Sequence, residues 1–147
     1  MQALIQLFTT GDVLAAAPEV HITPIIANKT STPIPTLSSN PAIVIAHVGY
    51  KSDTLSHALQ GWKALVEDVA KNEYWTRGYT VGEDKEGMSV RTVEVYESWE
   101  SLEKVHAQGE AVKKNQEQNG RERSAVHGAV RVRAVDGFLG REGRSRL

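Results

Sequence analysis

The chain has 147 residues, of which 40% are hydrophobic and 24% are charged, and its formal net charge is −1. This length predicts a single domain, and so small a charge gives no reason to expect a nucleic-acid or membrane-surface partner. The absence of cysteine excludes disulfides, thiolate nucleophiles and cysteine metal ligands. No apolar run approaches the roughly 20 residues that cross a bilayer, and the N-terminus lacks the features of a signal peptide, so a cytoplasmic protein is expected.

The first 41 residues differ in composition from those that follow. Four prolines stand among serines and threonines between residues 21 and 41. Because proline lacks an N–H and restricts the residue before it, this stretch is predicted to be extended chain, neither helix nor central strand. Its isoleucines favour packing on the domain or on a partner subunit. We therefore divide the chain into an N-terminal arm (1–41), a domain (42–139) and a flexible tail (140–147).

The domain begins with a strand and a long helix. Residues 42–50 are almost all apolar or β-branched, which is typical of a central strand. Residues 54–72 repeat apolar side chains at helical spacing, with Trp62 on the apolar stripe. Residues 74–81 predict a second strand. One face of that strand would present an aromatic, a cation and an aromatic in a row: Trp75, Arg77 and Tyr79.

A polar turn at residues 82–87 joins this strand to a third and predicts a hairpin. Residues 88–96 alternate as a strand does, so that successive side chains point to opposite sides. One set contains Val90, Thr92, Glu94 and Tyr96, and the other contains Arg91, Val93 and Val95.

A second helix follows this strand at once. Ser98 is a good N-cap, and Val105 and His106 are expected on the helix face that points inward. Gly109 is expected to kink or divide the helix, and Asn119, followed by a glycine, to end it.

The last strand is predicted over residues 124–135, where Val126 and Val130 belong to an alternating apolar set that suggests a buried face. The order from residue 42 is strand, helix, strand, strand, helix, strand, which predicts an α+β domain of the ferredoxin-like βαββαβ type. Such a sheet has helices on one face only. We assign Val90, Thr92, Glu94 and Tyr96 to the other face and expect a second copy of the chain to cover it, giving a homodimer with a cavity between sheet and helices.

The stretch VEVYESWESLEKVH resembles the most recognisable segment of the antibiotic biosynthesis monooxygenase (ABM) domain of the dimeric α/β-barrel superfamily. That segment is an apolar strand with a glutamate and an aromatic, a serine-led helix and an inward histidine, which Glu94, Tyr96, Ser98 and His106 match. The resemblance covers roughly residues 42–137 and leaves out the N-terminal arm. It departs from the family before the second strand, where residues 72–75 replace a Glu-Pro-Gly-Cys-like turn. There the chain is also similar to stress-responsive barrels and plant polyketide cyclases.

The resemblance implies a small enzyme that acts without cofactor or metal on an aromatic or polyketide-like substrate. A base would remove a proton from a phenol or an acidic C–H, and hydrogen-bond donors would hold the resulting anion. The anion would then react with oxygen or attack an internal carbonyl. Base candidates are His106 and His47, with Tyr96 as a third catalytic residue. Candidates for contact with the substrate are Trp62, Tyr74, Trp75, Arg77, Tyr79, Arg91 and Glu94.

Each of these residues also has a purely structural interpretation. His106 could be a core histidine with one hydrogen bond, and His47 could face the dimer interface. Glu94 is expected to pair with an arginine, Arg91 or Arg77, because an unpaired buried carboxylate is costly. Trp62 fits the helix core, and the aromatics of residues 74–79 could pack instead of lining a pocket.

Other chemistries lack their motifs. The histidines show no metal-ligand spacing, and the chain has neither a Gly-x-Ser-x-Gly elbow nor a dinucleotide fingerprint. The hypothesis from sequence is a cofactor-independent, monooxygenase-like enzyme of secondary metabolism. The alternatives are a polyketide cyclase or lyase-isomerase on the same fold, and a non-catalytic dimeric barrel that binds a small ligand or serves in assembly.

Overall fold

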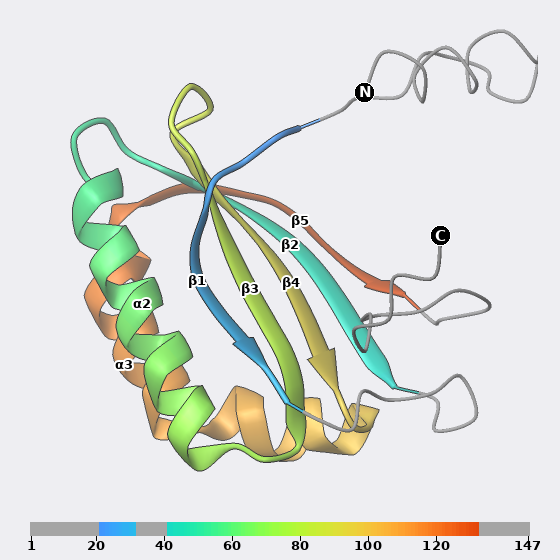
Figure 1. Ribbon diagram of the computed structural model, residues 1–147. Helices are drawn as coiled ribbons and strands as arrows, with labels where there is room; N and C mark the ends of the chain where they lie inside the picture. Colours follow the sequence, from blue (N-terminus) through green and yellow to red (C-terminus); the bar gives the residue numbers. More distant parts are fainter. Residues whose placement is uncertain (1–20, 32–40, 133–147) are drawn as a thin grey trace, which may run out of the picture.

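The computed structural model describes residues 21–31 and 41–132, which form one sheet and one layer of helices (Figure 1). The expected tail at 140–147 and the last residues of the predicted final strand lie outside the described residues. The strands are β1 (Ile25–Thr30), β2 (Ala42–Tyr50), β3 (Thr76–Asp84), β4 (Ser89–Tyr96) and β5 (Arg123–Val132). The helices are α2 (Leu55–Asn72) and α3 (Glu110–Asn119), with shorter segments η2 (Ser101–Val105), η3 (His106–Gln108) and η4 (Gly120–Glu122).

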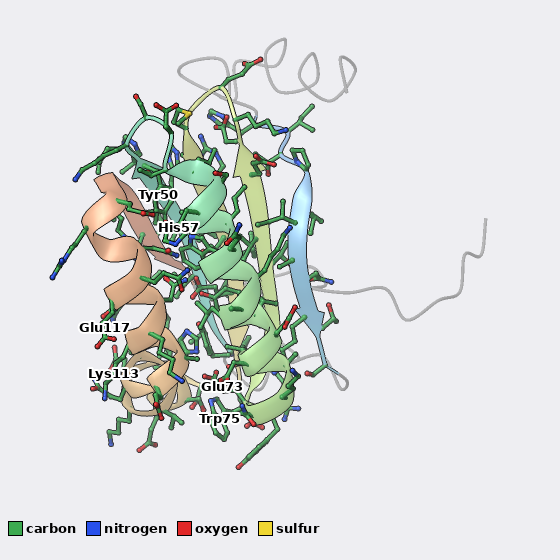
Figure 2. The ribbon with its side chains drawn as sticks, turned by 90° about the vertical axis from the view of Figure 1, so that its left-hand side faces the viewer. Tyr50, His57, Glu73, Trp75, Lys113 and Glu117 are labelled. Atoms are coloured by element: carbon green, nitrogen blue, oxygen red, sulfur yellow. The ribbon has the colours of Figure 1, made fainter. Side chains whose placement is uncertain are left out.

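The sheet is antiparallel throughout, and its spatial order is β1-β3-β4-β2-β5. Without β1, the chain order β2-α2-β3-β4-α3-β5 and this strand order are those of a ferredoxin-like domain, as the sequence predicted. Both α2 and α3 cover the same face of the sheet (Figures 1 and 2). Within the part of the chain described here, no helix has the length and apolar character to cross a bilayer.

The core lies between α2 and the sheet. Trp62 and Val69 of α2 belong to the same buried cluster as Val90 and Tyr96 of β4. The assignment of this β4 set to the uncovered face was therefore wrong, because these side chains lie beneath the helices. Alternation separates the two faces of a strand but does not say which one a helix will cover. Thr92 and Glu94 have the polar side chains expected of a solvent-exposed face, but in the structure they are buried and hydrogen-bonded to each other.

The other face of the sheet is partly apolar and uncovered in the single chain. Ile45 is 46% exposed, and it lies opposite Val93 on one neighbouring strand and Val130 on the other, which are 45% and 57% exposed. Val126, expected to be buried, is 62% exposed. The row Ile45, Val93 and Val130, which we call the open-face patch, is the kind of surface that a partner covers.

The segment between β4 and α3 is irregular helix. The Ser98 hydroxyl accepts a hydrogen bond from the Ser101 N–H at 3.1 Å, so Ser98 begins the helical segment as predicted. A π-helical turn, η2, and a 3₁₀ turn, η3, then follow, and Gly109 adopts an extended conformation that separates them from α3. This change of helical pitch buries His106, whereas Val105, expected to point inward, is 40% exposed.

Part of the N-terminal arm joins the domain. Residues of β1 pair with β3 at the edge of the sheet, so the expected packing of the arm on the domain is confirmed for Ile25–Thr30. The division of the chain at residue 41 stays a prediction. Lys29 of β1 lies opposite Tyr79 and is only 7% exposed.

Candidate active site

A cluster of polar and aromatic side chains lies buried beneath the helices. It is formed by Glu73 directly after α2, Tyr79 of β3, Glu94 and Tyr96 of β4, and His106 of η3. Every one of these residues is less than 9% exposed. The ring centre of His106 lies 5.6 Å from that of Tyr79 and 4.9 Å from that of Tyr96. An imidazole, two phenols and two carboxyl groups therefore occupy one protected region.

Glu73 and His106 form the central pair. Nδ1 of His106 lies 2.8 Å from Oε2 and 3.1 Å from Oε1 of Glu73, and the Thr76 hydroxyl donates to Oε2 at 2.6 Å. Burial raises the pKa of Glu73, but hydrogen bonds from His106 and Thr76 and the charges of His106 and Lys29 lower it further, so the net shift is downward. Because an ionised carboxylate can only accept, Nδ1 carries a proton, and the lone pair of a neutral ring lies on Nε2. This is the tautomer of a general base held by a carboxylate.

Glu94 is satisfied by its own strand. It accepts hydrogen bonds from the Thr92 hydroxyl at 2.7 Å and from the Tyr96 hydroxyl at 2.8 Å. The expected pairing with an arginine was therefore wrong. Arg91 lies on the opposite face of the strand, where its guanidinium is 3.6 Å from Asp84.

The two phenols of the cluster are held in their neutral form. Burial raises the pKa of Tyr96, and the negative charge of Glu94 and the hydrogen bond between the two residues raise it further. Burial also raises the pKa of Tyr79 well above its usual value, again with the help of Glu94. Both hydroxyls therefore remain donors at neutral pH, and neither is suited to act as the base.

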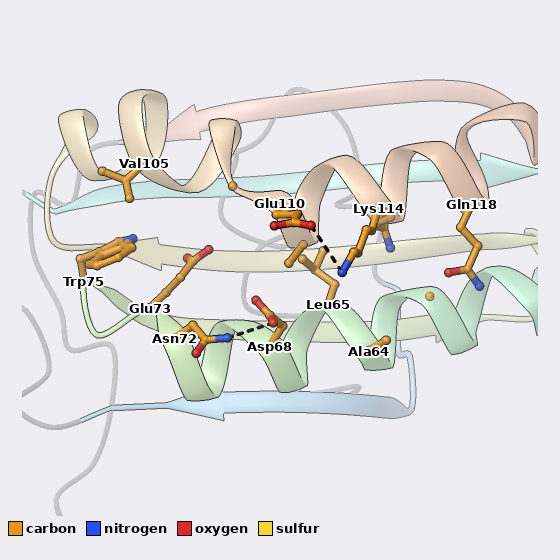
Figure 3. A pocket seen from close by; sticks show the side chains of 14 residues that line it. Ala64, Leu65, Asp68, Asn72, Glu73, Trp75, Val105, Glu110, Lys114 and Gln118 are labelled. Carbon is orange, nitrogen blue, oxygen red and sulfur yellow. Dashed lines mark hydrogen bonds and ion pairs between the residues drawn. The ribbon is translucent and has the colours of Figure 1, made fainter.

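A groove of about 550 Å³ runs between α2 and α3, with Glu73 and Trp75 at one end and Gln118 at the other (Figure 3). Two of the residues that line it carry a buried donor atom without a partner among the described residues: Nε1 of Trp75 and Nδ2 of Asn115. Asn115 is only 4% exposed. An unsatisfied buried N–H is unfavourable, so a side-chain rotation that brought either donor to an acceptor oxygen of a ligand in the groove would be favourable.

Gly109 leaves this groove open beside the Glu73–His106 pair. A Cβ atom at this position would lie 3.6 Å from Oε1 of Glu73 and only 3.0 Å from the carbonyl oxygen of His106. The absence of a side chain therefore lets the groove reach the carboxylate. At the side of the groove, Glu110 and Lys114 form an ion pair at 3.7 Å.

The structure brings together some of the predicted residues and separates others. His106, Tyr96, Tyr79 and Glu94 share the buried cluster, and Trp75 lines the groove. The other predicted residues lie elsewhere. Trp62 is in the core and donates to the Tyr50 hydroxyl at 2.7 Å, and Tyr74 is 73% exposed. Arg77 pairs with Glu97 at 2.9 Å, and His47 and Arg91 lie on the open face of the sheet. The row of Trp75, Arg77 and Tyr79 predicted for one face of β3 does not form. The pairing register shifts between Thr76 and Gly78, so Arg77 does not share a face with Tyr79.

Sequence reasoning missed Glu73, Thr76 and Asn115. Glu73 lies 33 residues before His106, and no short-range pattern connects the two. The only local signal is the spacing of three residues between Glu73 and Thr76, whose side chains are hydrogen-bonded. Within residues 21–31 and 41–132, no group of three or more potential ligands could hold a metal ion.

No family model and no curated protein sequence matches the chain. Solved structures do match. A proposed monooxygenase from Lactobacillus acidophilus superposes with a TM-score of 0.66 over 76% of this chain at 14% identity. A proposed antibiotic biosynthesis monooxygenase from Caulobacter crescentus superposes with a TM-score of 0.61 at 19% identity, over 66% of this chain and 92% of that one. A third, from Bacteroides thetaiotaomicron, gives 0.59 at 18% identity, over 73% and 99%.

The chain has the ABM-like fold. Identities at this level establish the fold alone, because unrelated activities share such frames. This chain also spans only 50% of the Lactobacillus protein, so the match concerns one part of that molecule. In the ABM-like fold seen here, the buried cluster lies between the sheet and the helices, and the groove between α2 and α3 leads to Glu73 (Figure 3).

Proposed function

We propose that the protein is a cofactor-independent monooxygenase-like enzyme that acts on an aromatic or polyketide-type small molecule in secondary metabolism. The observation that carries this proposal is the Glu73–His106 pair, which is buried beside two neutral phenols, together with the groove that Glu73 lines at one end. The names of the solved structures with this fold support the monooxygenase part of the proposal.

The proposed reaction begins with proton removal. Nε2 of His106 takes a proton from a phenolic O–H or from an acidic C–H beside a carbonyl, and Glu73 stabilises the imidazolium that forms. Trp75 Nε1 and Asn115 Nδ2 have no partner among the described residues, and on rotation into the groove they would donate to the oxygen on which negative charge develops. The volume of the groove, about 550 Å³, falls in the usual range for a site that binds a small molecule.

Oxygen is the second substrate in this proposal. The carbanion passes two electrons to O₂ and forms a C–O bond, and the resulting peroxide takes up the proton from His106. Loss of water from this hydroperoxide leaves a carbonyl where the substrate had a CH₂ group, so that one CH₂ and one O₂ give one C=O and one H₂O. A cyclase on the same frame would use the same base, but the carbanion would attack a carbonyl within the substrate and no oxygen would be consumed.

We further propose that two copies pair through their sheets. The open-face patch of Ile45, Val93 and Val130 supports this, because it is an exposed apolar row that runs from the middle strand β4 across β2 to the edge strand β5. The helical face of each copy, with its groove, would remain accessible in such a pair.

Oxygen uptake with an anthrone or a related phenolic substrate tests the proposal. The wild type is expected to consume one O₂ per substrate, and His106→Gln to lose activity by about 10²-fold to 10⁴-fold. His57→Gln is the matched control, because His57 is an exposed histidine on α2 that pairs with Glu122 at the surface. Product formation without oxygen uptake would indicate a cyclase, and full activity of His106→Gln would contradict the assignment of the base.

A further inference from the structure

Lys29 is a buried lysine that reaches from the edge strand β1 to the end of α2. Its Nζ donates a hydrogen bond to the carbonyl oxygen of Val69 at 3.0 Å and another to the carbonyl oxygen of Glu73. These carbonyls belong to the last turn of α2 and the residue after it, and each also accepts a backbone N–H: Val69 from Glu73 at 3.0 Å and Glu73 from Thr76 at 3.3 Å. Lys29 is therefore a second, charged donor to both carbonyls at the C-terminal end of this helix.

The location suits a cation, although burial disfavours it. The C-terminal end of a helix carries partial negative charge, which stabilises an ammonium group placed there. Burial lowers the pKa of Lys29, the carboxylate of Glu73 acts to raise it, and the charge of Arg77 lowers it, with a downward shift as the result. If residue 29 only filled space at this edge, an apolar side chain would be more favourable than a buried lysine. The hydrogen bonds of Lys29 therefore indicate a role beyond packing.

The residue that Lys29 holds is the one that holds the candidate base. The main-chain carbonyl of Glu73 accepts from Lys29, while the side-chain carboxylate of the same residue accepts from Nδ1 of His106 and from Thr76. Glu73 lies after the helix has ended, with a φ of −115° and a ψ of 87°. Its N–H still donates to Val69, and its carbonyl oxygen accepts from the Thr76 N–H as well as from Lys29. The Thr76 hydroxyl holds the carboxylate, and Lys29 adds a charged donor to the main-chain carbonyl.

We propose that Lys29 is a positioning residue: by fixing the main chain of Glu73, it keeps the carboxylate aimed at Nδ1 of His106 and so sets the tautomer of that ring. Its role in a reaction rests on the function proposed above, but its effect on His106 does not. The strand that carries Lys29 is an addition to the βαββαβ core, so β1 completes the site from outside that core.

The charged and titratable groups around His106 are consistent with this role. Glu73 lies on one side, Tyr79 and Tyr96 face the ring from β3 and β4, and Glu94 lies beyond the phenols. With the phenols neutral and Glu94 occupied by Thr92 and Tyr96, Glu73 is the acceptor at Nδ1. The position of Glu73 therefore decides which nitrogen of a neutral ring carries the proton.

The test is the tautomer of His106, measured by ¹⁵N NMR of the full chain at a pH where the ring is neutral. The signals are assigned by their loss in His106→Gln. In the wild type we expect more than ~90% of the neutral ring to carry its proton on Nδ1, and in Lys29→Met we expect this share to fall to about half. Lys29→Arg, whose guanidinium can also donate to carbonyl oxygens, is expected to restore the wild-type spectrum. Lys71→Met is the matched control, since Lys71 is exposed in the last turn of the same helix.

A wild-type tautomer in folded Lys29→Met would overturn the proposal. If that variant does not fold, Lys29→Thr places on the strand a β-branched polar side chain that is too short to reach either carbonyl, and a shift towards the Nε2–H form is expected there as well. An unchanged spectrum in folded Lys29→Thr would also contradict the proposal. In oxygen uptake, Lys29→Met is expected to lower kcat about 10-fold to 100-fold and leave KM unchanged, because the groove is not altered. The NMR result stands even if the wild type consumes no oxygen, so the two proposals can fail separately.

Discussion

The carboxylate of Glu73 lies 2.8 Å from the imidazole Nδ1 of His106, and the two residues are 7% and 5% exposed. Glu73 follows the end of α2, and His106 lies in the irregular segment before α3, so the pair connects the chain segments next to the two helices. Because both are buried, their interaction is less screened by solvent than a surface ion pair would be. This pair is the feature on which the candidate site depends, and it can be tested from both of its members.

Glu73→Gln is expected to lower the rate of oxygen uptake by about 10²-fold or more, because an amide cannot stabilise the imidazolium as a carboxylate does. The amide can also turn its NH₂ group towards Nδ1, which would favour the opposite tautomer. Glu67→Gln serves as the control, since Glu67 is exposed on the same helix. Equal loss in both variants would show that the effect is not specific to the pair with His106.

We predict opposite effects for substitutions of two tryptophans, one that lines the groove and one in the core. Trp75 Nε1 has no partner among the described residues, whereas Trp62 Nε1 donates to the Tyr50 hydroxyl at 2.7 Å. Trp75→Phe is therefore expected to weaken binding of a phenolic ligand about 10-fold and to leave the free energy of unfolding unchanged. Trp62→Phe is expected to lower the free energy of unfolding by about 1 kcal/mol and to leave the affinity unchanged.

Calorimetric titration and urea unfolding of both variants check this pair of expectations. A loss of stability in Trp75→Phe together with wild-type affinity would mean that its indole N–H is satisfied within the protein and does not face a ligand.

The sequence was sufficient for the order of the elements from residue 42, but it did not show that β1 joins the sheet or which face of each strand the helices cover. The helical period of residues 54–72 and the alternation of residues 88–96 are local, and both elements form as predicted. Which face of β4 is covered depends on the helices, and Glu94 was misplaced because two neighbours on its own strand satisfy it. The shift between Thr76 and Gly78 leaves no mark in the alternating pattern either.

Of the central pair of the site, only His106 could be predicted from the sequence. His106 stands in a recognisable stretch, but its partner Glu73 is distant in sequence and is brought near by the path of the chain after α2. The unpartnered donors of Trp75 and Asn115 become visible only once packing decides which polar atoms find partners.

His47 provides a prediction about pH. Its Nε2 lies 2.8 Å from the Ser89 hydroxyl, and its ring lies 4.5 Å from that of His127. Burial lowers the pKa of His47, and the charges of Arg91 and His127 lower it further, with a smaller opposing effect from Asp84. Because the folded-state pKa lies below the unfolded value of about 6.5, the unfolded chain binds the proton more readily, and this part of the stability is present above that pH and lost as the pH falls below it.

In His47→Gln, the fall in the free energy of unfolding between pH 7 and pH 5 should therefore be smaller than in the wild type. Urea unfolding at both pH values measures it, and His57→Gln is the control for removing an exposed histidine. The same fall in His47→Gln as in the wild type would show that another group is responsible for the pH dependence.

The open-face patch makes the last prediction. Val93 is 45% exposed at the centre of the sheet, opposite Ile45, and a pairing of two sheets would bury it against the partner. Val93→Glu places a charge in that contact, where each copy would bring its own carboxylate against an apolar surface, so the dimer is expected to weaken at least 100-fold. Val105→Glu is the matched control, because Val105 is similarly exposed, at 40%, on the helical side. Light scattering over a range of concentrations should give a dimer for the wild type and the control but a monomer for Val93→Glu. A monomeric wild type would leave the patch to another partner, and a dimeric Val93→Glu would place the interface on a different surface.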